Sequence, residues 1–500
     1  MVFSQEAITL KKKYLDSINA FPELLSAVVS NNLRVPFELK MLSRHWEPGG
    51  GASLYLINTQ SQRYFLKVKH CSIFVESRLE SEPEFIHIPS LKNEALFLDL
   101  LNSPQTPKVI FYEERNDYSF LALEYLEPFE QAVTHMSANQ LLLSWDKLES
   151  FVRRMYSLNI VHTDLHEGNL CFRKDELVVC DFEEARMLFQ DQPFEISLDY
   201  CGQNNFGDVG AFPEETGKGI GGLTCLVRLR KVFQSLVLKR LRDCLAECNF
   251  DQNCPFNSDI LQEEDPRIYQ SINLTGLNVI GQRPVRDSRK NVFEYFLFRQ
   301  SQRKSSVIRH VDIGSNLGIF CFLAVKQPFD VESIGLEAYD RYVEAANAIR
   351  FITDSSMVCF RQFVCGESDF DEIAYGGVDV CTLLSVYHHI VSRDDFLSSL
   401  ERNRPTLILA EFATQERYYP ERGSVAAEID YIRARLGYGE VVTLMHSPDY
   451  GRPLVLFADE PVTTIDRIFM RLAATRLFSL GMALLRRSAR ARSKKHPAVA

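Results

Sequence analysis

The chain has 500 residues, of which 46% are hydrophobic and 24% are charged, and its net charge is −10 at pH 7. A chain of this length and composition can bury at least two hydrophobic cores, as expected of a globular protein with two domains. The acidic balance argues against a general nucleic-acid binder, and no basic run is interleaved with aromatic residues in the RNA-binding manner. We therefore expect no nucleic-acid partner.

The twelve cysteines do not indicate a disulfide scaffold. The chain is long, and Met1 to Lys13 lacks the apolar segment of a secretory signal, so we expect reduced thiols and a cytoplasmic location. Cys244, Cys248 and Cys254 cluster, but their spacings do not match a zinc ribbon and no fourth ligand is near. Structural zinc is therefore disfavoured.

Three consecutive glycines, Gly49, Gly50 and Gly51, precede a run in which apolar residues alternate. Because glycine has no Cβ, such a loop lets backbone N–H groups approach phosphate oxygens closely. The segment is a candidate nucleotide-binding loop, with a simple hairpin turn as the alternative.

Lys67 lies in a strand-like run of large apolar residues, Tyr64 to Val68. An ammonium group buried there is costly unless an anion pairs with it, which favours a phosphate together with a helix carboxylate. Glu94, in the amphipathic stretch Asn93 to Leu101, is the candidate carboxylate. The alternative for Glu94 is a solvated helix position.

Residues 162–169 read H-T-D-L-H-E-G-N, and the triplet D-F-E follows after eleven further residues, at 181–183. Phosphoryl transfer needs a carboxylate at the acceptor hydroxyl and oxygen ligands for Mg²⁺. The spacing assigns Asp164 as the base and Asn169 and Asp181 as metal ligands.

These segments together resemble the protein-kinase-like superfamily over about residues 31 to 255. The resemblance is closer to the branch that acts on sugars and other small hydroxyl compounds, whose loop reads H-x-D-x-H-x-x-N. It implies ATP and Mg²⁺ as cofactors. After a buried strand predicted over residues 120–123, the backbone of Glu124 and Leu126 is placed to meet adenine.

Three departures from the pattern of phosphorylation-regulated protein kinases bear on activity. Thr163 stands in place of Arg, Glu183 replaces the glycine of D-F-G, and no A-P-E follows. The missing Arg argues against control by an activation loop. Glu183 keeps open a pseudoenzyme scaffold that binds nucleotide without turnover, although the other motif residues are intact.

A second constellation begins at Ser306, where an apolar strand enters a glycine-containing turn before a helical stretch from Ile319. Such a turn opens the crevice of a doubly wound sheet. A second strand ends at Glu337, about 20 residues on, where an acid accepts hydrogen bonds from ribose hydroxyls. The candidate cofactor contacts in the turn are Asp312, Gly314, Ser315, Asn316 and Gly318.

Two further segments complete the pattern. Glu367 lies in a loop placed to contact adenine, and a buried strand over residues 378–385 ends at Ser385, just before His388 and His389. This order resembles class I S-adenosylmethionine methyltransferases over about residues 256 to 460, and implies S-adenosyl-L-methionine as cofactor. A dinucleotide dehydrogenase is the alternative, disfavoured because G-x-x-x-G departs from G-x-G-x-x-G.

The two halves in one chain resemble the bacterial bifunctional kinase–methyltransferases that terminate O-antigen polysaccharide chains. Leu384 to Ile390, Ile268 to Gln270 and His446 to Pro448 add to that resemblance. It implies a glycan or lipid-linked polysaccharide acceptor, whose terminal sugar is phosphorylated and then capped by methylation of the phosphate. The domain order differs, because the kinase comes first here. A kinase fused to a methyltransferase of unrelated acceptor is the alternative.

Methylation of a phosphate sets its own requirements. A phosphomonoester oxygen is already anionic and needs no general base to attack a methylsulfonium, so the site needs positioning and cations. The available groups are Arg283, Arg286, His388, His389 and Arg452. The alternative for the histidines is a strand-end pair satisfied by the backbone.

From Thr463 onward, nine Lys or Arg accompany one Asp, so this tail carries +8 and the remainder of the chain −18. Five apolar residues fall near helical spacing, namely Ile465, Ile468, Phe469, Leu472 and Leu480. No apolar run reaches the ~20 residues of a spanning helix, so the tail suits a helix lying on an anionic membrane surface. A contact with the acidic body or a partner protein is the alternative.

We therefore predict a transferase that is cytoplasmic, or peripheral on the inner face of the cell membrane. Residues 1–30 form an N-terminal helical extension, 31–255 an α+β protein-kinase-like domain, 256–460 an α/β Rossmann-type class I methyltransferase domain, and 463–500 a basic amphipathic tail.

Overall fold

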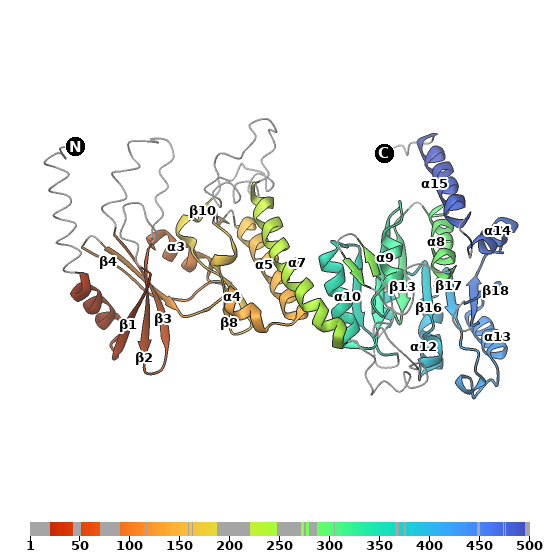
Figure 1. Ribbon diagram of the computed structural model, residues 1–500, viewed down its shortest axis with the longest axis horizontal. Helices are drawn as coiled ribbons and strands as arrows, with labels where there is room; N and C mark the ends of the chain where they lie inside the picture. Colours follow the sequence, from red (N-terminus) through yellow and green to blue (C-terminus); the bar gives the residue numbers. More distant parts are fainter. Residues whose placement is uncertain are drawn as a thin grey trace. The chain divides into compact units, whose positions relative to one another are not determined.

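A computed structural model describes residues 21–43, 52–70, 91–116, 118–158, 160–162, 164–187, 221–247, 272–274, 277–279, 288–304, 306–365, 370–374, 377–447, 451–473, 475 and 477–495. These residues form two compact units, which divide between Leu236 and Val237 (Figure 1). The boundary expected at residues 255 and 256 lies outside the described residues. No helix in the described ranges combines the length and the apolar character needed to cross a bilayer.

The first unit contains a five-stranded sheet in the order β1-β2-β3-β5-β4, in which all neighbouring strands are antiparallel. Lys67 lies on β3 and pairs with Leu54 of β2 and Leu121 of β5. This central position accounts for the burial of the lysine. The strands are β1 (Phe37–Ser43), β2 (Ser53–Thr59), β3 (Arg63–His70), β4 (Val109–Arg115) and β5 (Tyr118–Glu124).

A helix over residues 21–33 packs against this sheet. Its buried apolar residues recur at helical spacing, and they share one core cluster with Tyr55, Leu66 and Phe120: Phe21, Leu25, Val28 and Val29. The rings of Phe21 and Phe120 are nearly parallel, with centroids 6.5 Å apart. The described part of the expected N-terminal extension therefore belongs to the core of the first unit.

Helix α3 (Leu91–Leu101) contacts β3, β4 and β5 of the same sheet. One stripe of α3 is buried, and its members are Leu91, Glu94, Phe97, Leu98 and Leu101. Glu94 is thus carried into the interior by the same spacing that buries the leucines.

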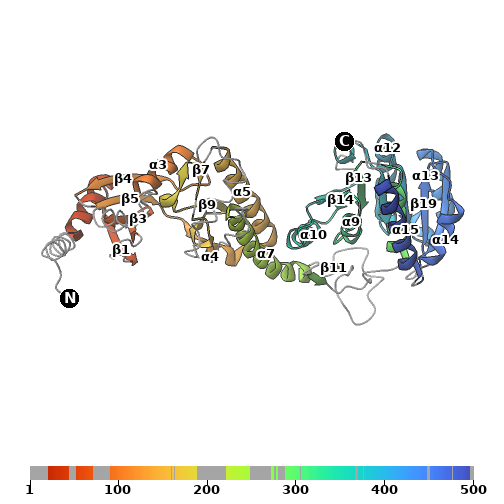
Figure 2. The same cartoon turned by 90° about the horizontal axis from the view of Figure 1, so that it is seen from above.

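The other part of the first unit contains one long helix and the first part of another, which continues beyond Leu236. Helix α5 (Ala138–Ser157) begins at a capping box, in which Ser137 and Gln140 each accept the other's backbone N–H. Trp145 of α5 meets Phe233 of α7 (Gly221–Glu247) edge to face at 5.5 Å, so the helices lie side by side (Figure 2). The shorter elements are β6 (Glu127–Pro128), α4 (Phe129–Ala132), η1 (Val133–His135), β7 (Ile160–Val161), η2 (Glu167–Asn169), β8 (Leu170–Arg173), β9 (Glu176–Val179), η3 (Phe182–Glu184) and β10 (Arg186–Met187).

The second unit is built on a seven-stranded sheet in the order β15-β14-β13-β16-β17-β19-β18. The five strands from β15 to β17 are parallel, whereas β19 runs antiparallel to both β17 and β18. The sheet is therefore mixed and mostly parallel, as predicted for an α/β domain. Its strands are β13 (Ile308–Ile313), β14 (Val331–Glu337), β15 (Val358–Gln362), β16 (Val380–Leu384), β17 (Leu407–Glu411), β18 (Glu440–His446) and β19 (Pro453–Ala458).

Helices connect the parallel strands, because a parallel pair needs a crossover. Every residue of β17 and β19 is buried, as expected where both faces of a sheet are covered. The carboxyl ends of β13, β14, β16 and β17 lie at one edge, where such sheets bind ligands. The other elements are β11 (Ile272–Leu274), β12 (Leu277–Val279), α8 (Ser288–Ser301), α9 (Ile319–Val325), α10 (Asp340–Ile352), α11 (Phe370–Ala374), η5 (Tyr387–His389), α12 (Arg393–Arg402), η6 (Glu416–Tyr418) and α13 (Val425–Leu436).

The tail, expected as one amphipathic stretch, forms two helices, α14 (Thr464–Leu472) and α15 (Leu477–Lys495). Phe469 of α14 stacks on Tyr295 of α8 with centroids 4.8 Å apart, and Asp466 accepts a hydrogen bond from the same tyrosine at 2.7 Å. Helix α14 is therefore attached to the second unit. Of the five apolar residues expected to face a membrane, the exposed ones are Ile465, Ile468 and Leu480.

Candidate active sites

The first candidate site is centred on the ammonium group of Lys67. Its Nζ atom lies 2.8 Å from Glu94 Oε2 and 2.6 Å from Asp181 Oδ1, so strand β3, helix α3 and the turn after β9 meet at one point. Burial alone would lower the pKa of Lys67, but the neighbouring carboxylates outweigh it and hold the pKa well above its usual value. The lysine is therefore charged although it is only 7% exposed.

The pKa values of the two carboxylates beside Lys67 are shifted in opposite directions. Burial raises the pKa of Glu94 to about 7, against the opposing effect of Lys67. Burial acts in the same direction on Asp181, but there Lys67 outweighs it and the pKa lies below its usual value. The environment of Lys67 therefore makes Asp181 a stronger acid than usual and Glu94 a weaker one.

Asp181 sits in a strained turn. Its φ of 66° lies in the left-handed region, which Asp tolerates better than most residues with a Cβ. The next residue, Phe182, is fully buried against the ring of His162 at 4.6 Å. Burial lowers the pKa of His162, so its neutral ring donates from Nε2 to the carbonyl of Cys180 at 2.7 Å.

Asn169 and Asp181 stand at the same end of one hairpin. Leu170 of β8 pairs with Val179 of β9, and Cys180 N donates to the carbonyl of Asn169 at 2.8 Å. The carboxylate and amide oxygens that these two side chains offer are the type of ligand that Mg²⁺ prefers. The residues present therefore fit the metal.

Asp164 is held by its neighbours in the loop. Asn169 Nδ2 donates to the Asp164 carbonyl at 2.7 Å and to its Oδ2 at 3.1 Å, which leaves the amide oxygen of Asn169 for a metal. His166 Nε2 lies 3.6 Å from the same Oδ2, and the contact with Asp164 raises the pKa of His166. The carboxylate expected to act as base is thus oriented from two sides.

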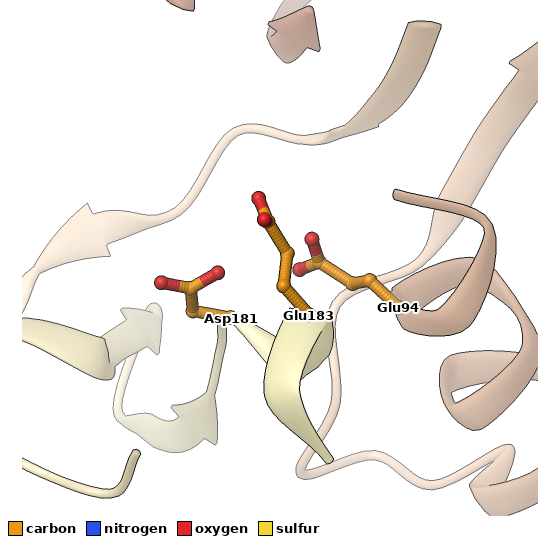
Figure 3. A group of neighbouring side chains, drawn as sticks. All are labelled: Glu94, Asp181 and Glu183. Atoms are coloured by element: carbon orange, nitrogen blue, oxygen red, sulfur yellow. The ribbon is translucent and has the colours of Figure 1, made fainter. Parts of the chain in front are cut away.

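Three carboxylates converge on this site, with oxygen atoms within 4.8 Å of one another: Glu94, Asp181 and Glu183 (Figure 3). Such a cluster can hold a metal ion, but Lys67 Nζ already lies within 3.7 Å of all three. The cation at the centre of the cluster is therefore the lysine. Glu183 has a second cationic neighbour, because Lys69 Nζ contacts its Oε2 at 2.6 Å.

Of the remaining residues predicted for the first site, the structure describes only some. Glu124 pairs with the Arg173 guanidinium, and its backbone N–H donates to the carbonyl of Lys108 at 3.0 Å. Leu126 is buried nearby, and the adenine contact expected of Glu124 and Leu126 stays a prediction. Thr163 and the three glycines at 49–51 lie outside the described residues.

The second candidate site begins at the turn after β13. Gly314 and Gly318 have φ of 70° and 82°, which favour glycine. A Cβ on Gly318 would lie 2.1 Å from the ring of Phe360, and one on Gly314 would lie 2.4 Å from Val386. The turn therefore requires glycine at both positions, for its backbone angle and for the close packing around it.

Glu337, at the carboxyl end of β14, closes this turn. Its two carboxylate oxygens accept the backbone N–H groups of Asn316 at 2.8 Å and Tyr339 at 3.2 Å. Burial raises the pKa of Glu337, and these hydrogen bonds oppose the shift. Each carboxylate oxygen has a further lone pair, so the side chain can still accept bonds from a ribose.

A buried polar chain crosses three strands beneath the turn. Thr382 donates to Asp312 at 2.6 Å, while the ring of His310 bonds Thr382 at 3.0 Å and Ser333 at 2.7 Å. Burial raises the pKa of Asp312 to about 7 and lowers that of His310 to about 3. Ser315 is also buried, and burial disfavours the charged forms of Asp312 and His310 beneath the turn.

Ser385, predicted as a cofactor contact, directly follows β16. Ser385 has a φ of 62° and donates to Glu411 of β17, whose carboxylate lies 3.3 Å from the Arg289 guanidinium of α8. Glu411 and Arg289 are both buried, so the pair fixes the strand ends against α8.

The structure changes the expected role of the histidine pair. Burial, together with Arg452 and Arg393, lowers the pKa of His388 to about 2 and of His389 to about 4. Both imidazoles are therefore neutral near pH 7, and the positive charge expected here comes from the two arginines. Arg283, Arg286 and Glu367 lie outside the described residues.

Several residues of these sites were missed by sequence reasoning. Arg393, Glu411 and Arg289 are set by tertiary packing and had no signal in spacing. The sequence did contain a signal for Lys69. It lies two residues from Lys67, and alternate residues of a strand share a face.

Comparison with known proteins gives distant similarity. No model of a known protein family matches the chain. The serine/threonine-protein kinase MPS1 of Encephalitozoon cuniculi (strain GB-M1) is 24% identical over 174 residues, which cover 34% of this chain and 28% of the kinase.

Two solved structures share 12 to 19% of residues with the matched parts. One is the N-terminal domain of EvdMO1, whose crystal structure was determined in the presence of SAH and D-fucose. The match covers 46% of this chain and 97% of that domain, with a TM-score of 0.32. The other is the bifunctional kinase-methyltransferase WbdD. The match covers 36% of this chain and 41% of WbdD, with a TM-score of 0.28. The match therefore covers less than half of the length of WbdD.

Proposed function

We propose that this chain phosphorylates a hydroxyl group with ATP and methylates the product with S-adenosyl-L-methionine. One observation carries the first activity: Lys67 meets Glu94 and Asp181, from three separate elements, at 2.8 and 2.6 Å. An ammonium held in this way is positioned to receive the phosphates of a nucleotide.

The residues around it supply the remaining roles. Asp164 accepts the proton of the acceptor hydroxyl, while Asn169 orients its carboxylate. Asn169 and Asp181 are the ligands for Mg²⁺, which when bound neutralises and orients the transferring phosphate. Asp181 suits this role because its side chain is 37% exposed, unlike Glu94.

Glu337 and the turn at Gly314 support cofactor binding in the second unit. S-Adenosyl-L-methionine when bound supplies a methyl group on a cationic sulfur. Glu337 is positioned to accept hydrogen bonds from the ribose, and the glycines let the backbone approach closely.

The acceptor that best suits this site is a phosphomonoester. His388 and His389, with pKa values lowered to about 2 and about 4, are poor general bases at neutral pH. A hydroxyl acceptor needs such a base, whereas a phosphate is already anionic and is attracted by Arg393 and Arg452. Phosphorylation in the first unit creates this kind of acceptor, so the two activities form a sequence.

The acceptor molecule we propose is the end of a glycan, such as a lipid-linked surface polysaccharide. The test is to incubate the protein with Mg-ATP, S-adenosyl-L-methionine and candidate glycans, and to follow the mass of each glycan. Addition of phosphate, and then of phosphate plus methyl on the same molecule, is expected. Methyl transfer without phosphate would point to an unrelated acceptor, and nucleotide binding without either product to a pseudoenzyme.

A further inference from the structure

The pair formed by Lys69 and Glu183 stands beside the catalytic lysine of the proposed phosphotransferase, and the role inferred for the pair rests on that function. Lys69 Nζ lies 2.6 Å from Glu183 Oε2, while the other oxygen, Oε1, lies 3.7 Å from Lys67. The side chains of Lys69 and Glu183 are only 10% and 11% exposed. Glu183 thus presents one oxygen to each of two lysines.

The charges at this site show why the second lysine matters. Three carboxylates surround Lys67, and buried like charges this close cannot all remain ionised unless cations compensate them. With Lys67 and Lys69 both charged, the five groups carry one net negative charge when all are ionised. The carboxylate with substantial exposure is Asp181, so the surplus charge lies where a metal ion can meet it.

Without Lys69, the charge of Glu183 would lack its shortest ion pair. A buried carboxylate that loses its partner is strongly destabilised, and a cation 3.7 Å away would be drawn toward it. That cation is Lys67, which would then be drawn away from Glu94 and from the bound phosphates.

We propose that Lys69 is a positioning residue that neutralises Glu183, so that Lys67 remains available to Glu94 and to the nucleotide. Glu183, which replaces the glycine of D-F-G, is then compatible with activity because Lys69 compensates its charge. Glu183 in turn ties the D-F-E turn to β3, while Asn93 of α3 donates to the Glu183 carbonyl at 2.9 Å.

Four variants test this idea: Lys69→Met, Glu183→Gln, the double variant Lys69→Met/Glu183→Gln, and Lys69→Arg. The control is Lys40→Met, an exposed lysine on β1. Calorimetry measures binding of a non-hydrolysable ATP analogue with Mg²⁺, and steady-state assays give KM and kcat for phosphotransfer. Thermal unfolding is followed alongside, to separate loss of fold from loss of binding.

Lys69→Met is expected to weaken analogue binding by about tenfold or more, because the freed carboxylate competes for Lys67. Removing that carboxylate should restore binding in the double variant to within about threefold of the wild type. Lys69→Arg keeps the charge and should behave like the wild type, as should Lys40→Met. KM for ATP should change more than kcat.

Two results would overturn the inference while wild-type protein binds the nucleotide: unchanged binding by Lys69→Met, or a double variant as impaired as Lys69→Met. The second result would mean that Lys69 acts only through packing. Failure of the wild-type protein to bind Mg²⁺ and the ATP analogue would instead overturn the proposed phosphotransferase function, and the inference with it.

Discussion

The two candidate sites differ in the contacts that shape them. In the first unit, charged groups pair directly, with Lys67 and Lys69 among three carboxylates. In the second, burial disfavours the charged forms of Asp312 and His310, two glycines shape the turn after β13, and the buried pair Arg289–Glu411 holds the strand ends. The first site should therefore fail when a charge is removed, and the turn after β13 when a volume or a backbone angle is changed.

The largest effect is expected where the charge of the first site is removed at its exposed carboxylate. Asp181→Asn keeps the shape of the side chain but removes an anionic ligand and the partner of Lys67. Phosphotransfer should fall by about 10²- to 10³-fold or more, as when a group that stabilises transition-state charge is lost. Radiolabelled phosphate transfer measures this directly.

The same variant has an internal control in the second unit. Methyl transfer to a chemically phosphorylated acceptor should be unchanged, because the contact of Asp181 with Lys67 lies within the first unit. Undiminished phosphorylation by Asp181→Asn would refute its role in the first site.

In the second unit, a change of volume should matter more than a change of backbone angle. Gly318→Ala places a Cβ 2.1 Å from Phe360, whereas Gly377, with a similar φ of 88°, has nothing within 4 Å of an added Cβ. Both substitutions should cost about 1 to 2 kcal/mol of unfolding free energy from the left-handed backbone.

Only Gly318→Ala should lose further unfolding free energy, because the ring of Phe360 must shift to admit the new Cβ. Its affinity for S-adenosyl-L-methionine, measured by calorimetry, should fall about tenfold or more while Gly377→Ala retains wild-type affinity. Equal affinities of the two variants would show that this turn does not contact the cofactor.

The neutral groups of the second unit predict a dependence on pH. The folded-state pKa of His310 is lowered to about 3, below its unfolded value near 6.5, so the unfolded chain binds the proton more tightly. The contribution of neutral His310 to the unfolding free energy is fully present above the unfolded-state pKa. It is lost as the pH falls toward the folded-state pKa. Asp312, with its raised pKa, acts in the opposite direction over part of this range.

Comparison with His310→Gln isolates the histidine. Between pH 6.5 and about 4, the unfolding free energy of the wild type should fall by up to about 1.4 kcal/mol per pH unit more than that of the variant. Denaturant titrations at several pH values measure the difference. Parallel pH profiles would mean that the pKa of His310 is the same in the folded and the unfolded protein.

The smallest effect per residue is expected at the tail, which we propose binds an anionic membrane surface. Ile468 and Leu480 are 50% and 61% exposed, whereas Phe469 packs on α8. Ile468→Glu and Leu480→Glu should each weaken sedimentation with anionic vesicles, and basic residues should contribute about 1 kcal/mol each, less at high salt.

Leu143→Glu, in the first unit, is the matched control because Leu143 is 53% exposed. Truncation before Thr463 is a poorer test, since it removes Phe469 and Asp466 from their contacts with Tyr295. Vesicle binding that is equal in all three variants would exclude the membrane surface and favour a protein partner.

The two sites also differ in how much of each the sequence could predict. Lys67 with Glu94, and Asn169 with Asp181, could be expected together because their chemistry needs fixed residue types at known spacings along the chain. The pairing of Lys69 with Glu183 could not, since it joins residues 114 positions apart and depends on the register of β3 against a turn. Likewise, the low pKa of His388 results from burial that no local pattern reveals.

The attachment of the D-F-E turn to helix α3 has a consequence for inhibitors. Asn93 Nδ2 lies 2.9 Å from the carbonyl oxygens of both Glu183 and Ala185, and Phe182 is fully buried. If the first unit has the proposed phosphotransferase function, Phe182 corresponds to the phenylalanine whose packing distinguishes active from inactive protein kinases. Here, turning Phe182 outward would break both amide contacts and the Lys69 pair together. Compounds that require the inverted turn should therefore bind this protein weakly, and ligands that accept the turn as it stands should be favoured.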